Sequence, residues 1–521
     1  MSPILRSSQM AHRRTDPWLP SEETQGMVSD DILFSSVRAL GNAIQQRKLS
    51  AVELTSAYLE RLEAIGPQLG AVVTITRDLA LQQARAAEKE IAAGHYRGPL
   101  HGIPYGAKDA LAVKGYPTTW GTAPFRQQTF DHNATVIDRL DDAGAVLVGK
   151  LAMLEIVGGF GFDSADASFT GPVRTPWNRE RWAGGSSSGP GAATAAGLVA
   201  FALGSETGGS ILNPATYCGL AGMRPTYGRV SRHGAVALCW SLDKVGPMCR
   251  SADDCGLVLS AIAGYDPLDS TSMRKKFAYS RAERPRKFRL AIAKGTYDTV
   301  EPENKANFER SLKSLSSFAT ITHDVDFPDY PYGPMIQTIV NAEGANAFRE
   351  IIDNGRVHEL QNPVARVSGY VDTTVSAVDY LQAMRVRKIA RIKLDELFQQ
   401  YDALVAPTMS ATSGRVGERW SKAYLPPATG PSVTHHSPVT HHSRPGVSLL
   451  PVGNLAGVPG ITVPNGVGAD NVPTGLQFVG KSWSEATLLA IADAYQQATD
   501  WHKSRPPMEQ FPAHSRAAQT L

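Results

Sequence analysis

The chain has 521 residues, of which 42% are hydrophobic and 19% are charged, proportions that are ordinary for a globular protein. Its 52 basic and 49 acidic residues leave a net charge of +3, which gives no argument for nucleic acid or an anionic membrane as a partner. No apolar run approaches the length of a membrane span, and residues 1–20 lack the apolar core of a secretory signal, so a cytoplasmic protein is expected.

The first elements alternate between helix and strand. Residues 1–28 are polar and predict a poorly ordered segment. Ser50 and Glu53 have the spacing of a capping box, and apolar residues follow near helical spacing, so a helix is predicted over residues 51–64. A strand, a helix and a strand are then predicted over residues 70–76, 79–93 and 145–148. This alternation favours an α/β layer structure.

Lys108 lies in a strand-like segment, Gly102–Asp109, that Pro and Gly residues punctuate. Apolar residues lie on both sides of it, so we expect its side chain to be drawn inward. Burial lowers the pKa of a lysine because a low dielectric disfavours the charged form, and a neutral lysine can act as a general base. A salt bridge between Lys108 and a carboxylate is the alternative.

Two short segments imitate known motifs. Residues 144–150 match most of a phosphate-binding loop, but Leu151 replaces the hydroxyl that would hold Mg²⁺ and the middle is strand-like. Residues 185–189 fit the Gly-x-Ser-x-Gly pattern of a hydrolase elbow, but no apolar strand leads into them. We therefore favour neither interpretation.

Two Gly-Gly-Ser steps, Gly184-Gly185-Ser186 and Gly208-Gly209-Ser210, lie 24 residues apart and are joined by an apolar run. Glycines before a serine allow tight turns that can bring backbone N–H groups and a hydroxyl into one small space. Such an arrangement suits an acyl-transfer enzyme, which needs a nucleophile beside an oxyanion hole.

The second half of the chain continues the α/β pattern. A long amphipathic helix is predicted over residues 379–398, before a strand over residues 403–406. Residues 421–446 form a loop in which two near-identical segments each carry a His pair; a polar surface insertion is favoured over a metal site. The Pro-rich stretch from Arg505 predicts a tail. Small buried thiols are expected at Cys218, Cys239, Cys249 and Cys255.

Seven segments carry motifs that occur together, in this order, in one known family. They are His101–Asp109, Ala183–Gly197, Gly204–Ser231, Ser241–Asp254, Tyr401–Thr408, Asn454–Pro464 and Pro473–Gly480. On these segments the chain resembles the amidase signature family of serine hydrolases, over roughly residues 30–495. The resemblance implies one large α/β domain with a central mixed sheet and helices on both faces. We expect that domain over residues 29–504, with the loop 421–446 as an insertion and residues 505–521 as a C-terminal tail.

The resemblance also assigns roles. Ser210 would be the nucleophile, Ser186 a bridging serine that follows a cis peptide bond, and Lys108 the base. Ser187 would support this network by hydrogen bonding. The oxyanion hole would be formed by the backbone N–H groups of Thr207, Gly208, Gly209 and Ser210.

The implied reaction is hydrolysis of an amide through an acyl-enzyme. Neutral Lys108 takes a proton from Ser186, which takes one from Ser210 as that serine attacks the carbonyl; water later cleaves the acyl-enzyme by the same relay. The resemblance implies no metal and no organic cofactor. The expected partner is a small-molecule amide, with no nucleic acid and no membrane, and a homodimer fits a family that is often dimeric.

The chain departs from the family pattern beside the nucleophile. Ser188 and Pro190 replace a glycine and a serine, and Leu212 stands where the family often has Arg, which argues against a substrate that carries a carboxylate. Segments expected to border the site carry Phe160, Phe162, Leu212 and Trp240. These side chains predict an apolar acyl or aryl pocket, with a place in the core as the alternative.

Three functions follow. The first is a stand-alone amidase for small carboxamides, with aryl amides, esters and carbamates as further candidate substrates. The second is the amidase subunit of a tRNA-dependent amidotransferase, which releases ammonia from glutamine. The third is a non-catalytic binding protein on the same fold, against which the joint presence of Lys108, Ser186 and Ser210 argues.

Overall fold

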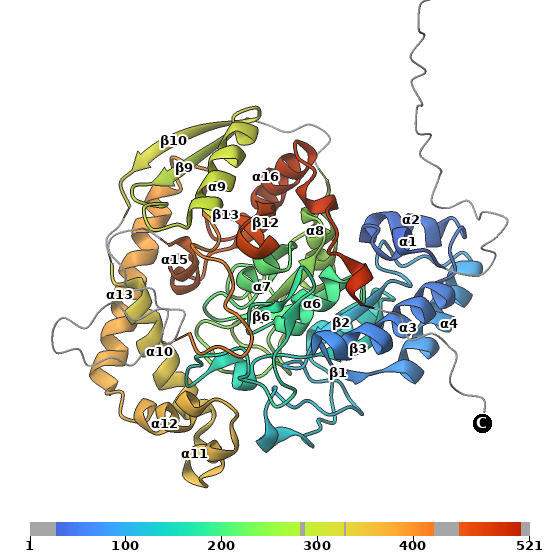
Figure 1. The fold of residues 1–521 in the computed structure, drawn as a ribbon, viewed down its shortest axis with the longest axis horizontal. Coiled ribbons are helices and arrows are strands. Elements are labelled where there is room, and N and C mark those ends of the chain that lie inside the picture. Colours follow the sequence, from blue (N-terminus) through green and yellow to red (C-terminus); the bar gives the residue numbers. More distant parts are fainter. Residues whose placement is uncertain (1–27, 282–286, 328–329, 421–447, 512–521) are drawn as a thin grey trace, which may run out of the picture.

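The computed structural model describes residues 28–281, 287–327, 330–420 and 448–511, and an eleven-stranded sheet runs through its middle (Figure 1). The strands of this sheet are β1 (Val72–Ile75), β2 (Pro104–Lys108), β3 (Val146–Leu151), β6 (Phe201–Glu206), β7 (Ala221–Arg224), β8 (Lys244–Cys249), β9 (Phe288–Ala293), β10 (Ala319–Val325), β11 (Ala403–Pro407), β12 (Gly460–Val467) and β13 (Pro473–Val479). A separate two-stranded sheet contains β4 (Arg174–Thr175) and β5 (Asn178–Trp182).

The α-helices surround the sheet. They are α1 (Asp30–Leu33), α2 (Val37–Gln45), α3 (Ala51–Leu69), α4 (Arg77–Ala92), α5 (Thr135–Asp142), α6 (Ser188–Ala195), α7 (Leu212–Tyr217), α8 (Ala252–Ile262), α9 (Pro302–Leu315), α10 (Tyr332–Ala347), α11 (Arg349–Asp353), α12 (Pro363–Asp372), α13 (Ala377–Leu397), α15 (Leu449–Ala456) and α16 (Glu485–Gln497). Short 3₁₀ turns cover Ala123–Phe125, Glu155–Gly158, Arg356–Glu359, Ala469–Asn471, Trp501–Lys503 and Met508–Gln510. Helices α1–α4 gather at one end of the sheet and α10–α13 at the other (Figure 1).

The sheet is mixed, as the family resemblance implies. Its strand order is β1-β3-β2-β6-β8-β7-β12-β13-β11-β9-β10. Strands β3, β2 and β6 are parallel, as are β11, β9 and β10, whereas every pair from β6 across to β11 is antiparallel. Strand β6 therefore has a parallel neighbour on one side and an antiparallel neighbour on the other.

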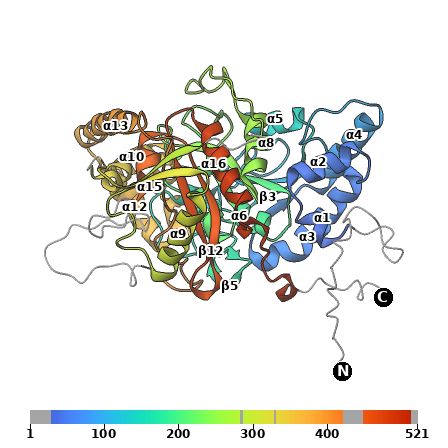
Figure 2. The same ribbon diagram turned by 90° about the horizontal axis from the view of Figure 1, so that it is seen from above.

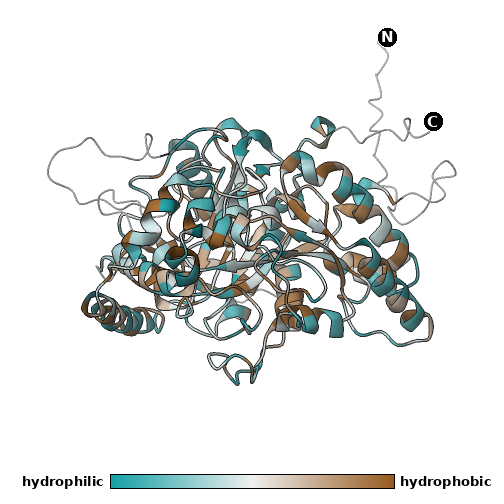
Figure 3. Ribbon diagram, turned by 90° about the horizontal axis from the view of Figure 1, so that it is seen from below, coloured by the Kyte–Doolittle hydropathy of each residue, from teal (hydrophilic) through white to brown (hydrophobic). Residues whose placement is uncertain are grey.

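Both faces of the sheet are buried, which explains the continuous apolar runs of its strands. In β3, Leu147 joins an apolar cluster with residues of α2, α5, α8 and α16, whereas Val146 and Val148 join a cluster with α4, α6 and α7 on the opposite face. Alternate residues of a strand point to opposite faces, so the two clusters place helices on both sides. The view from above shows these layers (Figure 2), and hydrophilic and hydrophobic residues alternate along the outer helices (Figure 3). The α/β class is confirmed.

The predicted elements form, with shifted ends. The helix predicted over residues 51–64 begins as expected, because Ser50 Oγ accepts hydrogen bonds from the N–H groups of Val52 and Glu53. It continues through Pro67 and stops at Gly70, whose φ of 65° closes the helix in a left-handed cap. The remaining predictions correspond to β1, α4, β3, α13 and β11, each within three residues at either end.

The segment that imitates a phosphate-binding loop is part of the sheet. Most of residues 144–150 belong to β3, and Lys150 forms an ion pair of 2.7 Å with Asp109 in which both side chains are fully buried. Lys150 also donates hydrogen bonds to the carbonyl of Pro117 and the hydroxyl of Thr118. The ammonium group of Lys150 thus binds groups of the protein itself.

Several predictions concern the ends of the chain and its thiols. The loop 421–446, residues 1–27 and residues 512–521 lie outside the described residues. Residues 505–511 of the predicted tail are described and pack on the domain, where Phe511 is buried and Gln510 donates to the carbonyl of Pro176. All four cysteines are buried and unpaired. Among the described helices, none combines the length and the apolar character that a membrane crossing requires.

Candidate active site

Lys108 is the last residue of β2 and is fully buried. Because β2 and β6 are parallel neighbours, its side chain reaches the end of β6, where its Nζ donates to Ser205 Oγ at 3.0 Å. The same Nζ donates to Ser186 Oγ at 2.8 Å. Lys108 forms no salt bridge with a described carboxylate. The next residue, Asp109, pairs instead with Lys150.

The environment of Lys108 favours its neutral form. Burial lowers the pKa of this lysine to about 7, and the negative charges of Asp243 and Glu206 oppose part of that decrease. A lysine in this state can both donate and accept a proton near neutral pH. Sequence reasoning found Lys108 but missed Ser205, because the hydrogen bond joins residues 97 positions apart.

Ser186 and Ser187 lie in a tight turn between β5 and α6. The Gly185–Ser186 peptide bond is cis. Gly184 has a φ of 84°, and a Cβ there would lie 2.5 Å from Asn213 Oδ1, which accepts a hydrogen bond from the Gly185 N–H at 2.9 Å. The glycine therefore permits the close approach that anchors this turn to α7.

Ser187 joins the turn to strand β6 and to the second serine. Its Oγ donates to the carbonyl of Ser205 at 3.1 Å and accepts from the N–H of Ser205 at 3.2 Å. Its own N–H donates to the carbonyl of Ser210 at 3.2 Å. The structure thus brings Lys108, Ser186 and the Ser210 segment together around Ser187 and Ser205.

The loop from Thr207 to Ser210 connects β6 to α7. Gly209 has a φ of 141°, which favours glycine, and a Cβ there would lie 2.8 Å from Leu450 Cδ2. A Cβ at Gly208 would meet no atom within 4 Å, so this residue faces open space. Among hydrogen bonds between described residues, none is donated by the N–H groups of Gly208, Gly209 or Ser210. These donors stand beside the partly exposed Ser210.

Asp243, which sequence reasoning did not single out, anchors the start of this loop. Its Oδ1 accepts from Thr207 Oγ1 at 2.5 Å, and its Oδ2 accepts from the N–H of Cys239 at 2.8 Å. Burial raises the pKa of Asp243, and the hydrogen bonds from Thr207 and Cys239 oppose that shift. Its position just before β8, the antiparallel neighbour of β6, was not visible from sequence spacing.

The four residues predicted to line a substrate pocket differ in burial and in the side chains they pack against. Phe160, Phe162 and Leu212 are buried and belong to three separate apolar clusters. Trp240 is 41% exposed, and its carbonyl accepts hydrogen bonds from Tyr227 and Arg232. Trp182 lies beside the residue that precedes Ser186, because a Cβ at Gly185 would lie 2.7 Å from Trp182 Cζ2. Phe162, Trp182 and Trp420 pack on one another there.

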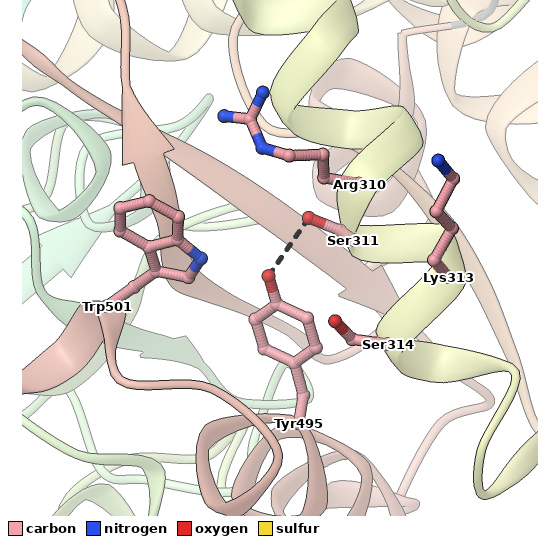
Figure 4. Close-up of a pocket in the computed structure, with 6 residues that line it drawn as sticks. All are labelled: Arg310, Ser311, Lys313, Ser314, Tyr495 and Trp501. Carbon is pink, nitrogen blue, oxygen red and sulfur yellow. Dashed lines mark hydrogen bonds between the residues drawn. The ribbon is translucent and has the colours of Figure 1, made fainter. Parts of the chain in front are cut away.

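A separate pocket of about 390 Å³ lies between α9, α16 and the turn at Trp501 (Figure 4). Ser311 and Tyr495 share a hydrogen bond of 2.9 Å in its wall, and Arg310 and Lys313 lie at its side. No residue of the Lys108 cluster lines it. Among the described residues, no group of three or more His, Cys, Asp or Glu side chains could hold a metal ion.

Residues 53–489 match the protein family described as Amidase. The chain is 35% identical to a glutamyl-tRNA(Gln) amidotransferase subunit from Moorella thermoacetica, over 92% of this chain and 99% of that protein. Its fold is similar to the peptide amidase of Stenotrophomonas maltophilia, with a TM-score of 0.75 and 28% identity over 91% of this chain and 98% of that one. A bacterial aryl acylamidase of the amidase signature family shares the fold with a TM-score of 0.77 and 21% identity, over 92% and 99% of the two chains.

Proposed function

The chain belongs to the amidase signature family of hydrolases, which act on carbon–nitrogen bonds, and on this premise we propose that it is a stand-alone amidase for small, uncharged carboxamides. The observation that carries the proposal is Lys108, whose buried Nζ lies within hydrogen-bond distance of Ser186 Oγ and has a pKa lowered to about 7. Burying a lysine without an ion-pair partner among the described residues costs folding free energy. A role in proton transfer accounts for a lysine at such a position.

In the proposed mechanism, Lys108 begins as the neutral amine and accepts the proton of Ser186. Ser186 in turn accepts the proton of Ser210, whose Oγ attacks the carbonyl carbon of the amide. The proton then returns through Ser186 to the departing amine, and water repeats the sequence on the acyl-enzyme. Ser187 holds the two serine segments at a fixed distance through its bonds to Ser205 and Ser210.

The oxyanion is proposed to bind at the N–H groups of residues 207–210. The open space in front of Gly208 and the unused donors of the loop support this assignment. Such preorganised donors stabilise the developing negative charge, and the loss of one commonly costs about 3 kcal/mol in the transition state. The side chain of Asp243 keeps the first of these residues, Thr207, in place.

The preference for uncharged substrates rests on two observations. Leu212, two residues after the proposed nucleophile, is fully buried and supplies no cation for a substrate carboxylate. Behind Gly185, the side chains of Leu154 and Trp182 form an apolar wall. An apolar or aryl acyl group fits such surroundings because it loses little hydration on binding.

A second function is favoured by the relative from Moorella thermoacetica, which matches this chain over nearly its whole length. In this case the protein would be the amidase subunit of a tRNA-dependent amidotransferase and would release ammonia from glutamine. The absence of a cation at Leu212 argues for the first function, because glutamine carries an α-carboxylate.

The test is a substrate panel with the purified full-length protein: neutral anilides, short aliphatic amides, aryl esters, carbamates and glutamine. We expect anilide hydrolysis that Ser210→Ala reduces at least about 1,000-fold. Ser413→Ala is the control for the loss of a serine hydroxyl, because the Ser413 hydroxyl is buried and makes no hydrogen bond to the described residues. Turnover that survives Ser210→Ala would overturn the proposal. Hydrolysis confined to glutamine would establish the second function in its place.

A further inference from the structure

Glu206 immediately precedes the loop of residues 207–210, which carries the proposed nucleophile, and its side chain is fully buried. We propose that Glu206 is a positioning residue that fixes the loop of residues 207–210 and supplies part of the negative charge that faces Lys108. This inference rests on the proposed function, in which Ser210 attacks and Lys108 accepts the proton. Glu206 itself touches neither substrate nor the reacting atoms.

One carboxylate oxygen closes the loop. Glu206 is the last residue of β6, and its Oε2 accepts hydrogen bonds from the N–H groups of Ile211 at 2.8 Å and Leu212 at 2.9 Å. Leu212 is the first residue of α7. The side chain therefore connects the end of the strand to the start of the helix, and residues 207–210 lie inside the ring so formed. Any shift of the carboxylate must move the N–H groups of the proposed oxyanion hole.

The other oxygen fixes the carboxylate to the rest of the molecule. Glu206 Oε1 accepts from Arg224 Nη1 at 3.0 Å and from Asn454 Nδ2 at 2.8 Å. Asn454 Oδ1 in turn accepts from Lys244 Nζ at 2.9 Å. Arg224 of β7 and Asn454 of α15 thus hold the carboxylate directly, and Lys244 of β8 holds Asn454 in turn.

Arg224 is itself held in a narrow place. A Cβ at Gly453 would lie 2.1 Å from its Nη2, and a Cβ at Gly460 would lie 2.6 Å from the same atom. Its Nε donates to the carbonyl of Val458 at 3.1 Å. The guanidinium group thus has little freedom to follow Glu206, which makes the pair a rigid anchor for the loop.

The charges around Glu206 keep it ionised. Burial would raise its pKa, but Arg224, Lys244 and the N–H of Leu212 together hold that pKa below the usual range. Burial also lowers the pKa of Lys244 to about 7, and Arg224 adds to this decrease. Among the described residues, the negative charges that act on Lys108 are those of Asp243 and Glu206, and both raise the pKa that burial has lowered.

These contacts predict two separable effects of Glu206→Gln. The amide lacks the negative charge, so the pKa of Lys108 falls further and the acid limb of the kcat/KM profile moves to lower pH. The amide also cannot serve Arg224 and both N–H groups as acceptor, so the loop loosens. We expect kcat to fall about 10- to 100-fold, because small misplacements of catalytic groups have effects of this size. We expect KM to change less than threefold.

The matched control is Glu485→Gln. Glu485 is a second fully buried glutamate that pairs with an arginine, Arg229, at 2.9 Å, and its Oε1 accepts from the N–H of Thr226 at 2.9 Å. This pair has the same chemistry but belongs to no part of the proposed site. Glu485→Gln should lower the melting temperature while leaving the pH limb, kcat and KM unchanged.

The experiment compares Glu206→Gln, Glu485→Gln and Ser210→Ala with the unaltered full-length protein. For each, the anilide kcat, KM, pH profile and melting temperature are measured, together with inhibition by a trifluoromethyl ketone analogue of the anilide. Attack by Ser210 on the ketone generates an oxyanion, so Glu206→Gln should weaken inhibition by the same factor as kcat. If Glu206→Gln does not fold, the double variant Glu206→Gln with Arg224→Met removes the stranded cation and should show the same shifts.

The outcomes are distinct. If Ser210→Ala is inactive and Glu206→Gln behaves as Glu485→Gln does, the inference about Glu206 is wrong and the proposed function stands. If Ser210→Ala remains active, the proposed function fails and the inference fails with it. If Glu206→Gln shifts the acid limb and weakens ketone inhibition while Glu485→Gln does neither, the result supports both the inference about Glu206 and the proposed function.

Discussion

At the scale of single residues, the site depends on a lysine that is kept close to its point of titration. Lys108 has no carboxylate in direct contact among the described residues, yet two carboxylates, Asp243 and Glu206, act on it from a distance. Burial and distant charge oppose each other, and the resulting pKa of about 7 leaves a large neutral fraction at physiological pH. Direct ion pairing would have kept the lysine protonated.

The first prediction concerns the pH dependence of catalysis. The base must be neutral, so kcat/KM for a neutral anilide should rise with pH through about 7 and level off above it. Below that value Lys108 is protonated and activity falls. The profile is measured from pH 5 to 9 with the full-length protein. An activity that is flat across this range would contradict the role of Lys108 as the base.

The second prediction concerns Ser205, whose Oγ accepts a hydrogen bond from Lys108 at 3.0 Å. Ser205→Ala removes a bond that stabilises the protonated amine, so the pKa of Lys108 should decrease and the acid limb should move to lower pH. A bond of this kind contributes about 1 kcal/mol, which limits the loss of kcat to roughly tenfold. The hydrogen bonds between the backbone of Ser205 and Ser187 Oγ remain, so the fold should be kept. A limb displaced to higher pH would refute this account.

Residue types and spacing could predict some of these roles and not others. The apolar surroundings of Lys108 predicted an inward-facing lysine and left a salt bridge open, and the repeated Gly-Gly-Ser steps predicted tight turns; the role of Lys108 as a base came from the family resemblance. Ser205, Asp243 and Glu206 carry no local signal, because their functions depend on which strands become neighbours. The predicted pocket residues were chosen because their segments were expected to border the site, and the fold places three of them, Phe160, Phe162 and Leu212, in separate apolar clusters.

At the scale of elements, hydrogen bonds hold the loop between β6 and α7 at its start, at its end and at the first turn of α7. Asp243 holds its first residue, Ser187 its last, and the hydrogen bonds of Ile211 and Leu212 close it. The helices were easier to predict than this loop because apolar periodicity is a local property. Even so, α3 runs past Gly66 and Pro67 because packing against β1 outweighs two unfavourable residues.

The third prediction compares two adjacent glycines of this loop. Gly209→Ala places a Cβ at a φ of 141° and 2.8 Å from Leu450, so it should destabilise the loop by about 1–3 kcal/mol and reduce kcat strongly. Gly208→Ala adds a Cβ to open space and should leave the melting temperature nearly unchanged. Because that Cβ would point toward the substrate side, its effect should be on KM. Thermal unfolding and steady-state kinetics of both variants test this difference. An equal loss of stability in the two variants would contradict the prediction.

At the scale of the whole molecule, buried charges tie distant parts of the chain together. Asp109 and Lys150 join the segment after β2 to β3, and Arg224 and Glu206 join β7 to β6. Such pairs add little net stability over apolar residues of equal volume, but removing one partner leaves an uncompensated charge. The fold class could be predicted from alternating elements, whereas the position of these pairs could not.

The fourth prediction tests this cost. Asp109→Asn leaves Lys150 without its counter-charge in a fully buried place and should lower the free energy of unfolding by about 3–5 kcal/mol. Asp353→Asn is the matched control, since Asp353 pairs with Arg349 on an exposed helix surface, and it should change stability by at most about 0.5 kcal/mol. Urea unfolding followed by fluorescence provides the comparison. Similar midpoints for the two variants would show that the buried pair is not critical.

The strand order has a consequence for how this chain can change in length. Ala107 pairs with Leu203 across β2 and β6, which sets the face of the sheet on which Lys108 emerges one residue later. Adding or deleting a single residue within β2 would turn Lys108 to the opposite face, away from Ser186 and Ser205, and the same change within β6 would turn Ser205 away from Lys108. The chemistry is therefore sensitive to odd-numbered insertions in these two strands, whereas connections outside the turn at Ser186 and the loop of residues 207–210 should tolerate insertions better. Chain-length variation in such proteins should concentrate in those connections, and the lengths of β2 and β6 should stay constant.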